Sequence, residues 1–217
     1  MEKTLRVTGR GILSVAPDQI RLSMTLGGVC PDYPAAVRTS AEKTDALQTC
    51  FAAAGFPAEE LRTSRFGVQA EYESFQDEKG NYRQRFTGYR FEHVLTLRFD
   101  ADDALLGRAL GALAAAGADP EFEIAYTVRD PEAAKATLLA AAVRDSRRKA
   151  QLLADAAGVT LGPIVSIDYS WGEMEILARP VNRMALCKAE SASDSIRLNI
   201  HPENIELNDT VTVVWSI

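Results

Sequence analysis

Apolar and polar residues alternate with a period of two in five segments of the chain, which is the pattern of a β-strand with one buried face. In the segment from Ile20 to Leu26, every second residue is apolar and the residues between them are polar. One buried and one solvated face is typical of antiparallel sheets. We therefore expect a largely antiparallel sheet. The other four alternating segments are residues 65–73, 89–99, 122–128 and 207–217.

Three further segments carry the start and stop signals of α-helices. Each begins after an aspartate, whose carboxylate can accept hydrogen bonds from the first free N–H groups of a helix. Each ends in Ala-Gly, where the glycine can adopt the left-handed conformation that closes a helix. Pro131 suits a first helical turn, because its missing N–H has no partner there. The predicted helices are 33–54 after Asp32, 101–116 after Asp100, and 131–157 after Asp130.

The order of these elements repeats along the chain. A strand, a helix that starts at an aspartate, and a second strand run from Ile20 to Val68 and again from Phe122 to Ile167. Two such halves bury every apolar stripe if their helices pack on one face of a continuous sheet. We therefore expect an α+β fold with two degenerate strand-helix-strand halves. We expect residues 1–217 to form a single domain.

Two connecting segments interrupt this pattern. Residues 76–81 are polar and contain Gly80-Asn81, which predicts the tip of a hairpin between two of the strands. Residues 172–195 show neither the strand period nor the helix period and end in a run of small polar residues. We expect them to form an irregular insertion or linker before the C-terminal strands.

Charge and cysteine content limit the partners and the compartment. The 24 Lys and Arg against 30 Asp and Glu give a net charge of -6, the wrong sign for a dedicated nucleic-acid binder. No apolar run is long enough to span a bilayer, so we expect no transmembrane segment. The first residues alternate like a strand and do not resemble a secretion signal. Cys30, Cys50 and Cys187 contain no CxxC pair, which favours a reducing cytoplasm.

Candidate catalytic and metal-binding groups are few. In the alternating pattern of its strand, His93 falls on the same side as its apolar neighbours. This favours a core or sheet-edge histidine over a general base. His201 precedes Pro202, which indicates an extended bend before a strand. The chain has no close pair of His or Cys, so we expect no metal, no cofactor and no catalytic residues. Gly9-Arg10-Gly11 imitates the start of a dinucleotide fingerprint, but a strand follows it, and a bend or bulge in that strand explains it better.

Two basic stretches are candidates for nucleic-acid surfaces. The first interrupts the third predicted helix opposite its apolar stripe, which predicts a solvated face. It consists of Arg144, Arg147, Arg148 and Lys149. The second combines aromatic residues with Arg83, Arg85, Arg90 and Arg98. Strand parity places Tyr89 and Phe91 on the buried side and Arg90 and Arg98 on the other, which argues against a base-stacking platform.

Several short motifs, in this order, resemble the SIMPL-domain family, which includes the YggE-like bacterial proteins. The resemblance covers nearly the whole chain except residues 172–195 and is densest at Ala142–Ala150. It implies an α+β fold and a family without an established reaction or catalytic residues. Members are typically exported, which makes the periplasm the alternative location, and some form large homo-oligomers or are linked to oxidative stress. The other motifs are residues 7–11, 16–18, 61–64, 87–90, 153–154, 157–158, 161–162, 202–207 and 211–213.

Three functional hypotheses remain open at this point. The first is a non-enzymatic, self-associating interaction protein, favoured by sheet edges that must be paired or covered. The second is a module that binds a small molecule, and the third is an uncharacterised enzyme. For a thiol-based redox role, Cys187 is expected to be more accessible than Cys50, which falls in the apolar stripe of the first predicted helix.

Overall fold

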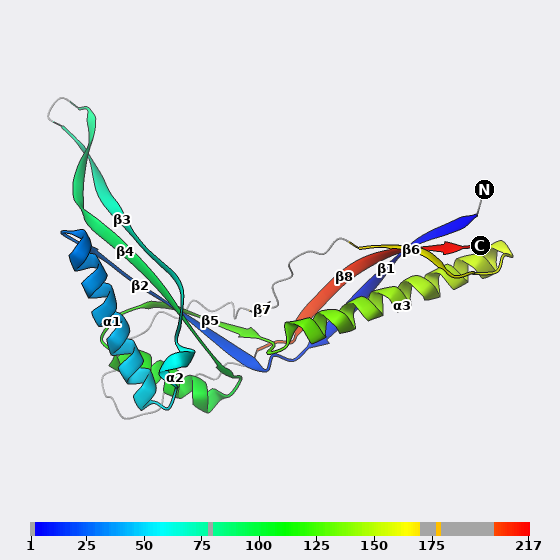
Figure 1. Ribbon diagram of the computed structural model, residues 1–217, viewed down its shortest axis with the longest axis horizontal. Helices are drawn as coiled ribbons and strands as arrows, with labels where there is room; N and C mark the ends of the chain where they lie inside the picture. The colour runs from blue at the N-terminus through cyan, green and yellow to red at the C-terminus, as the bar shows by residue number, and fades with distance from the viewer. Residues whose placement is uncertain (1–2, 78–79, 170–176, 179–201) are drawn as a thin grey trace. The chain divides into compact units, whose positions relative to one another are not determined.

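The computed structural model describes residues 3–77, 80–169, 177–178 and 202–217, and its elements are labelled in Figure 1. In chain order they are β1 (Thr4–Val15), β2 (Gln19–Cys30), α1 (Tyr33–Ala53), the 3₁₀ helix η1 (Ala58–Glu60), β3 (Arg62–Gln76), β4 (Tyr82–Asp100), α2 (Asp103–Ala115), β5 (Glu121–Thr127), α3 (Pro131–Ala157), β6 (Ile164–Asp168), β7 (Leu177–Ala178) and β8 (Ile205–Ser216). His201, Cys187 and most of the predicted insertion 172–195 lie outside the described residues.

The strands form two separate sheets, so the expectation of one continuous sheet is wrong. The three-stranded sheet has the order β1-β8-β6, and the five-stranded sheet has the order β3-β4-β2-β5-β7. The pairs β1–β8, β6–β8, β2–β4 and β3–β4 are all antiparallel, which confirms the α+β class with largely antiparallel pairing. The sheets separate because β1 pairs along its whole length with β8, from the far end of the chain, and not with β2.

The described elements fall into two units, each with its own core. The first contains β1, α3, β6 and β8, and the second contains β2, α1, β3, β4, α2 and β5. In the second unit, the apolar residues that alternate in β2 are completely buried, which confirms the predicted parity; they are Ile20, Leu22, Met24 and Leu26. In the first unit, α3 packs on β1 and β8 around a core that includes Val7, Val213 and Trp215.

The helix boundaries follow the predicted caps at two of the three starts. Asp32 accepts a hydrogen bond from the N–H of Ala35, and Asp130 accepts one from the N–H of Ala133. The predicted start of α2 at Asp100 is wrong, because Asp102 caps this helix through a 2.8 Å bond from the N–H of Leu105. The glycines after all three helices have positive φ, as expected for left-handed caps; they are Gly55, Gly117 and Gly158.

Candidate functional site

Strand β1 and helix α3 lie so close together that two positions of β1 have room only for glycine. A Cβ atom on Gly9 would lie 2.0 Å from the carbonyl oxygen of Ala142, and one on Gly11 would lie 2.2 Å from that of Leu138. Of the bend or bulge expected at these glycines, the bulge is wrong, since β1 pairs with β8 from Thr4 to Val15 without a register shift. The glycines serve the close approach of two backbones instead.

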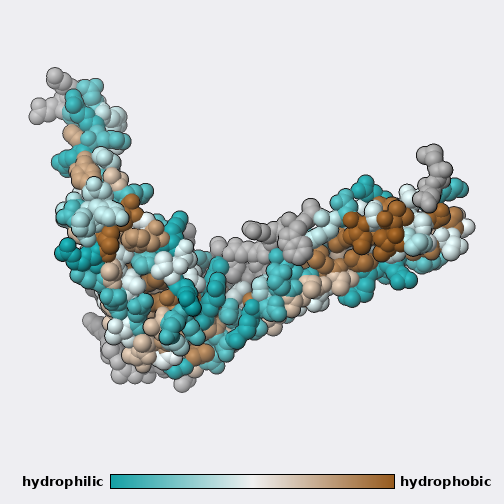
Figure 2. Space-filling view, in the orientation of Figure 1, coloured by the Kyte–Doolittle hydropathy of each residue, from teal (hydrophilic) through white to brown (hydrophobic). Residues whose placement is uncertain are grey.

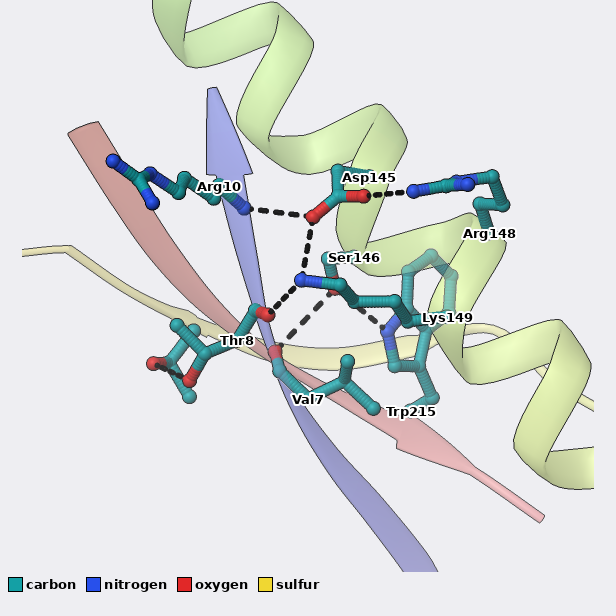
Figure 3. A network of polar contacts seen from close by, with 9 residues as sticks. Val7, Thr8, Arg10, Asp145, Ser146, Arg148, Lys149 and Trp215 are labelled. Carbon is teal, nitrogen blue, oxygen red and sulfur yellow. Dashed lines mark hydrogen bonds and ion pairs between the residues drawn. The ribbon is translucent and has the colours of Figure 1, made fainter. Parts of the chain in front are cut away.

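The close approach brings Asp145 of α3 to the backbone of β1, at the centre of the polar network in Figure 3. Its Oδ2 accepts a 2.9 Å hydrogen bond from the backbone N–H of Arg10. The Nζ of Lys149 lies 2.7 Å from the same oxygen and donates a 3.3 Å bond to the carbonyl of Thr8. Arg148 binds the other carboxylate oxygen at 2.7 Å. Side chains of α3 thus occupy backbone groups of β1 that an incoming strand would need.

A buried serine next to this network links three elements of the first unit, α3, β1 and β8. Ser146 has no exposed surface. Its hydroxyl donates to the carbonyl of Val7 at 3.4 Å and accepts from the indole N–H of Trp215 at 3.3 Å. Both hydrogen-bonding roles of the hydroxyl are therefore used, as a buried polar group requires. Ser146 holds α3 to the sheet and is not placed as a nucleophile.

The environment of Asp145 makes the stability of the first unit depend on pH. Hydrogen bonds from Arg148, from Lys149 and from the backbone of Arg10 lower the pKa of the Asp145 carboxyl well below its ordinary value of 3.8. A lowered pKa in the folded state means that the unfolded chain binds the proton more readily. The network therefore stabilises the fold fully above the unfolded pKa, and this contribution is lost as the pH falls below about 4.

We expect Asp145→Asn to lower the free energy of unfolding at pH 7, because it removes the charge that Arg148 and Lys149 bind. The difference from the wild type is expected to shrink as the pH falls from about 5 to about 2. Urea unfolding across this pH range measures it. Asp155→Asn is the matched control, since Asp155 lies on the same helix and accepts a bond from the uncharged Gln151. Equal pH profiles for the two variants would contradict the prediction.

The other outer strand of the three-stranded sheet, β6, is apolar and largely uncovered. Ile164, Val165 and Ile167 are 42%, 52% and 53% exposed. Figure 2 shows a hydrophobic area over the part of the first unit that contains β6. The one charged residue of β6, Asp168, binds Arg6 at 3.2 Å. An edge strand with exposed apolar residues leaves backbone groups that another strand can pair with.

The sequence analysis predicted a strand that ends near Ile167, which is β6, but it singled out neither the exposure of that strand nor Asp145. The signal for β6 was Ile164-Val165 directly after Gly162-Pro163, a short apolar run without alternation. The signal for Asp145 was its spacing of three and four residues from Arg148 and Lys149, which places all three on one helix face. Only the fold shows that this face meets the backbone of β1.

His93 lies on β4 among hydroxyl groups from two other elements. Its Nδ1 lies 3.0 Å from the Oγ of Ser40 and 3.2 Å from the Oγ1 of Thr44, both on α1. Its Nε2 lies 2.8 Å from the Oγ1 of Thr63 on β3, and the ring of Phe66 stands edge-on to it. Burial lowers the pKa of His93, which keeps the ring neutral at pH 7. The ring connects α1 to β3, and no carboxylate or thiol is among these partners.

The basic side chains of the β3–β4 hairpin bind carboxylates of the same hairpin, and Arg85 also lies over the ring of Phe75, 5.9 Å from its centroid. Arg90 binds Glu71 through two nitrogens at 2.9 and 2.7 Å, and these bonds lower the pKa of Glu71. Tyr72, Phe86 and Tyr89 form an edge-to-face ladder with centroids 5.6 and 5.4 Å apart. Arg83 and Arg85 also bind carboxylates of the hairpin, those of Asp77 and Glu73. With these guanidinium groups already paired, the hairpin does not present the basic groove of a nucleic-acid platform.

Two of the hollows on the described surface are wide open to solvent. One of about 410 Å³ lies on α3 and is lined by Arg144, Arg147, Arg148, Gln151 and Leu152. One of about 380 Å³ lies on the second unit and is lined by Ser23, Thr25, Arg65, Val94, Glu121, Phe122 and Glu123. Neither is enclosed in the way that is typical of a small-molecule site. The small-molecule hypothesis therefore stays a prediction.

The remaining candidate groups give no reaction centre within the described ranges. Cys30 and Cys50 are free and half-buried, and the thiol of Cys30 lies 3.8 Å from the Oγ1 of Thr39. In residues 3–77, 80–169, 177–178 and 202–217, no group of three or more His, Cys, Asp or Glu is placed to hold a metal ion. None of the helices in that part of the chain has the length and apolarity to cross a membrane.

The sequence matches the SIMPL family, described as a protein of unknown function (DUF541), over residues 5–215. The chain belongs to the SIMPL family. It is 27% identical over 207 residues to the 26 kDa periplasmic immunogenic protein of Brucella melitensis, covering 94% of this chain and 82% of that protein. The protein of the same name in Brucella abortus gives the same identity and coverage. The uncharacterised protein YggE of Edwardsiella ictaluri is 22% identical over 210 residues, with 97% and 85% covered.

These relatives correct the expected location. Both Brucella proteins are named as periplasmic, so the expectation of a cytoplasmic protein is wrong. That expectation rested on the first residues and on three cysteines without a disulfide pattern. The absence of a disulfide pattern among the cysteines does not by itself identify the compartment of a protein.

Proposed function

We propose that this SIMPL-family chain is a non-enzymatic, self-associating interaction protein that works in the periplasm. The observation that carries this proposal is the contrast between the two outer strands of the three-stranded sheet. β1 is closed by Asp145 and Lys149 of its own chain, whereas β6 exposes three large apolar residues. Natural sheets close or charge the edges that must stay unpaired, and an uncovered apolar edge marks a place of association.

The polar groups of the described chain support a role without catalysis. Ser146 and His93, the two residues that resemble parts of a nucleophilic site, both use their polar atoms to hold elements together. A nucleophile needs a base within hydrogen-bond reach that a third group orients. The link to oxidative stress rests on the family resemblance alone.

We expect light scattering to show a particle heavier than the 23.6 kDa chain at concentrations of tens of micromolar or more. The mass is expected to fall toward that of one chain on dilution, because the exposed apolar surface of β6 is small. A constant mass of one chain up to millimolar concentration would contradict the proposal. Size-exclusion chromatography coupled to light scattering makes this measurement on the whole chain.

A further inference from the structure

Three arginines line the hollow of about 410 Å³ on α3. Arg144, Arg147 and Arg148 are all exposed and lie within two turns of the helix. Arg144 and Arg147 form no ion pair with any residue that the structure describes. Arg148 binds Asp145 through one nitrogen at 2.7 Å, and its side chain is still 72% exposed. Because each guanidinium has five N–H donors, most of the donors around the hollow can bind a ligand.

Apolar side chains lie on the same side of α3 as these arginines. Leu152 lies one turn beyond Arg148, completes the lining of the hollow and is 63% exposed. Ala136 and Ala140, at two turns and one turn before Arg144, are exposed as well. The methylene stems of the arginines add further apolar surface, because long basic side chains carry their charge at the tip. A ligand in this hollow therefore contacts guanidinium groups and apolar carbon side by side.

Carboxylates limit the basic surface at two sides. One turn beyond Gln151, the carboxylate of Asp155 accepts a 2.8 Å bond from the amide of Gln151. On the side of β1, the carboxylate of Asp145 lies between Arg148 and the strand (Figure 3). The cluster is thus large enough for one or two phosphate groups. It does not form the extended basic groove that binds a nucleic-acid strand.

We propose that the surface formed by Arg144, Arg147, Arg148 and Leu152 binds the phosphate headgroups of an anionic phospholipid bilayer. Arginine binds phosphate through several charge-assisted hydrogen bonds, and an apolar residue beside it contacts the acyl boundary below the headgroups. The hollow is open to solvent, which suits a phosphate that a surface presents and does not suit a free ligand that must be enclosed. This inference goes beyond the proposed self-association and does not depend on it.

Vesicle sedimentation with the whole chain tests the proposal. The net charge of -6 means that an anionic bilayer repels the chain as a whole, so binding requires a local basic surface. We expect the wild type to sediment with vesicles of phosphatidylglycerol and phosphatidylcholine and not with vesicles of phosphatidylcholine alone. Binding is expected to weaken as the salt concentration rises, because salt screens exposed charges. A wild type that does not bind the phosphatidylglycerol vesicles overturns the proposal.

A double variant, Arg144→Gln with Arg147→Gln, locates the binding surface. It is expected to weaken binding to the anionic vesicles about tenfold or more, since each basic side chain near an anionic bilayer adds to the attraction. The matched control is Arg38→Gln with Arg62→Gln, which changes the net charge equally at two exposed arginines of the second unit. All four arginines are exposed, so both double variants are expected to unfold at the temperature of the wild type. Equal losses of binding in the two double variants would show that α3 is not the binding surface.

Two further measurements separate a bilayer from other anions. Leu152→Gln is expected to weaken vesicle binding several-fold because it removes the apolar contact, whereas Val37→Gln, at a 38% exposed valine of α1, is expected to have no effect. If Leu152→Gln binds like the wild type and millimolar inorganic phosphate at constant ionic strength releases the protein from the vesicles, the hollow takes free phosphate and the lipid assignment is wrong. Tighter binding to a single-stranded oligonucleotide or to polyglutamate than to the vesicles would also overturn it.

Discussion

Replacing Gly9 by alanine is expected to destabilise the first unit by more than about 3 kcal/mol. The added Cβ would lie 2.0 Å from the carbonyl oxygen of Ala142, 2.5 Å from the backbone nitrogen of Ser146 and 2.8 Å from its Cβ. Two of these three atoms belong to the backbone of α3 and cannot move without displacing the helix. The whole face of α3 that carries Asp145 and Ser146 would then separate from β1.

Urea unfolding measures this loss, and hydrogen exchange locates it. We expect amides of β1, α3 and β8 to lose protection in Gly9→Ala. Gly67→Ala is the matched control, because Gly67 also lies within a strand but a Cβ added there would meet no described atom within 4 Å. Since alanine restricts the unfolded chain more than glycine, this variant is expected to be neutral or stabilising by up to about 1 kcal/mol. A Gly9→Ala protein as stable as the wild type would show that β1 and α3 are not in such close contact.

Replacing Trp215 by alanine is expected to cost about 3 to 5 kcal/mol of the free energy of unfolding. Trp215 is only 5% exposed and packs in the core between β8 and α3. Its loss leaves a large cavity and removes the donor that binds the hydroxyl of Ser146. Trp215→Phe retains most of the apolar contact and loses only the indole N–H, so its cost is expected to be about 1 to 2 kcal/mol.

Ile217→Ala provides the comparison, since Ile217 lies two residues farther along and is 37% exposed. We expect this change to alter the free energy of unfolding by no more than about 0.5 kcal/mol. Chemical unfolding followed by circular dichroism measures all three variants. If Trp215→Ala lowered the free energy of unfolding no more than Ile217→Ala does, Trp215 would not be a core residue of the first unit.

Local features of the fold were readable from the sequence because they depend on neighbouring residues. Asp32 and Asp130 cap the helices that they were expected to cap, and the alternation from Ile20 to Leu26 places its apolar side inward. The start of α2 was wrong by two residues because Asp100 and Asp102 both satisfy the pattern of a cap. In the structure Asp100 ends β4, which leaves the capping position to Asp102.

The candidate surfaces required the tertiary structure. The pattern of residues 144–149 predicts a solvated basic face, and Arg148 is indeed exposed on it. Asp145 and Ser146 lie in the same stretch but face β1, a contact between residues about 135 positions apart. Sequence periodicity shows that a helix has two faces, whereas it does not show which strand lies beneath one of them.

The amino-acid sequence by itself determined the α+β class, the parity of β2, the helix caps at Asp32 and Asp130 and the resemblance to the SIMPL family, since these follow from patterns over a few residues or from ordered motifs. Only the tertiary structure decided that β1 pairs with β8, that the strands form two sheets, and that Gly9 and Gly11 serve a backbone contact. It also decided that side chains of α3 bind the β1 edge of the three-stranded sheet, whereas the β6 edge exposes apolar residues. Strand partners are chosen by burial across the whole chain, so local patterns leave them undetermined.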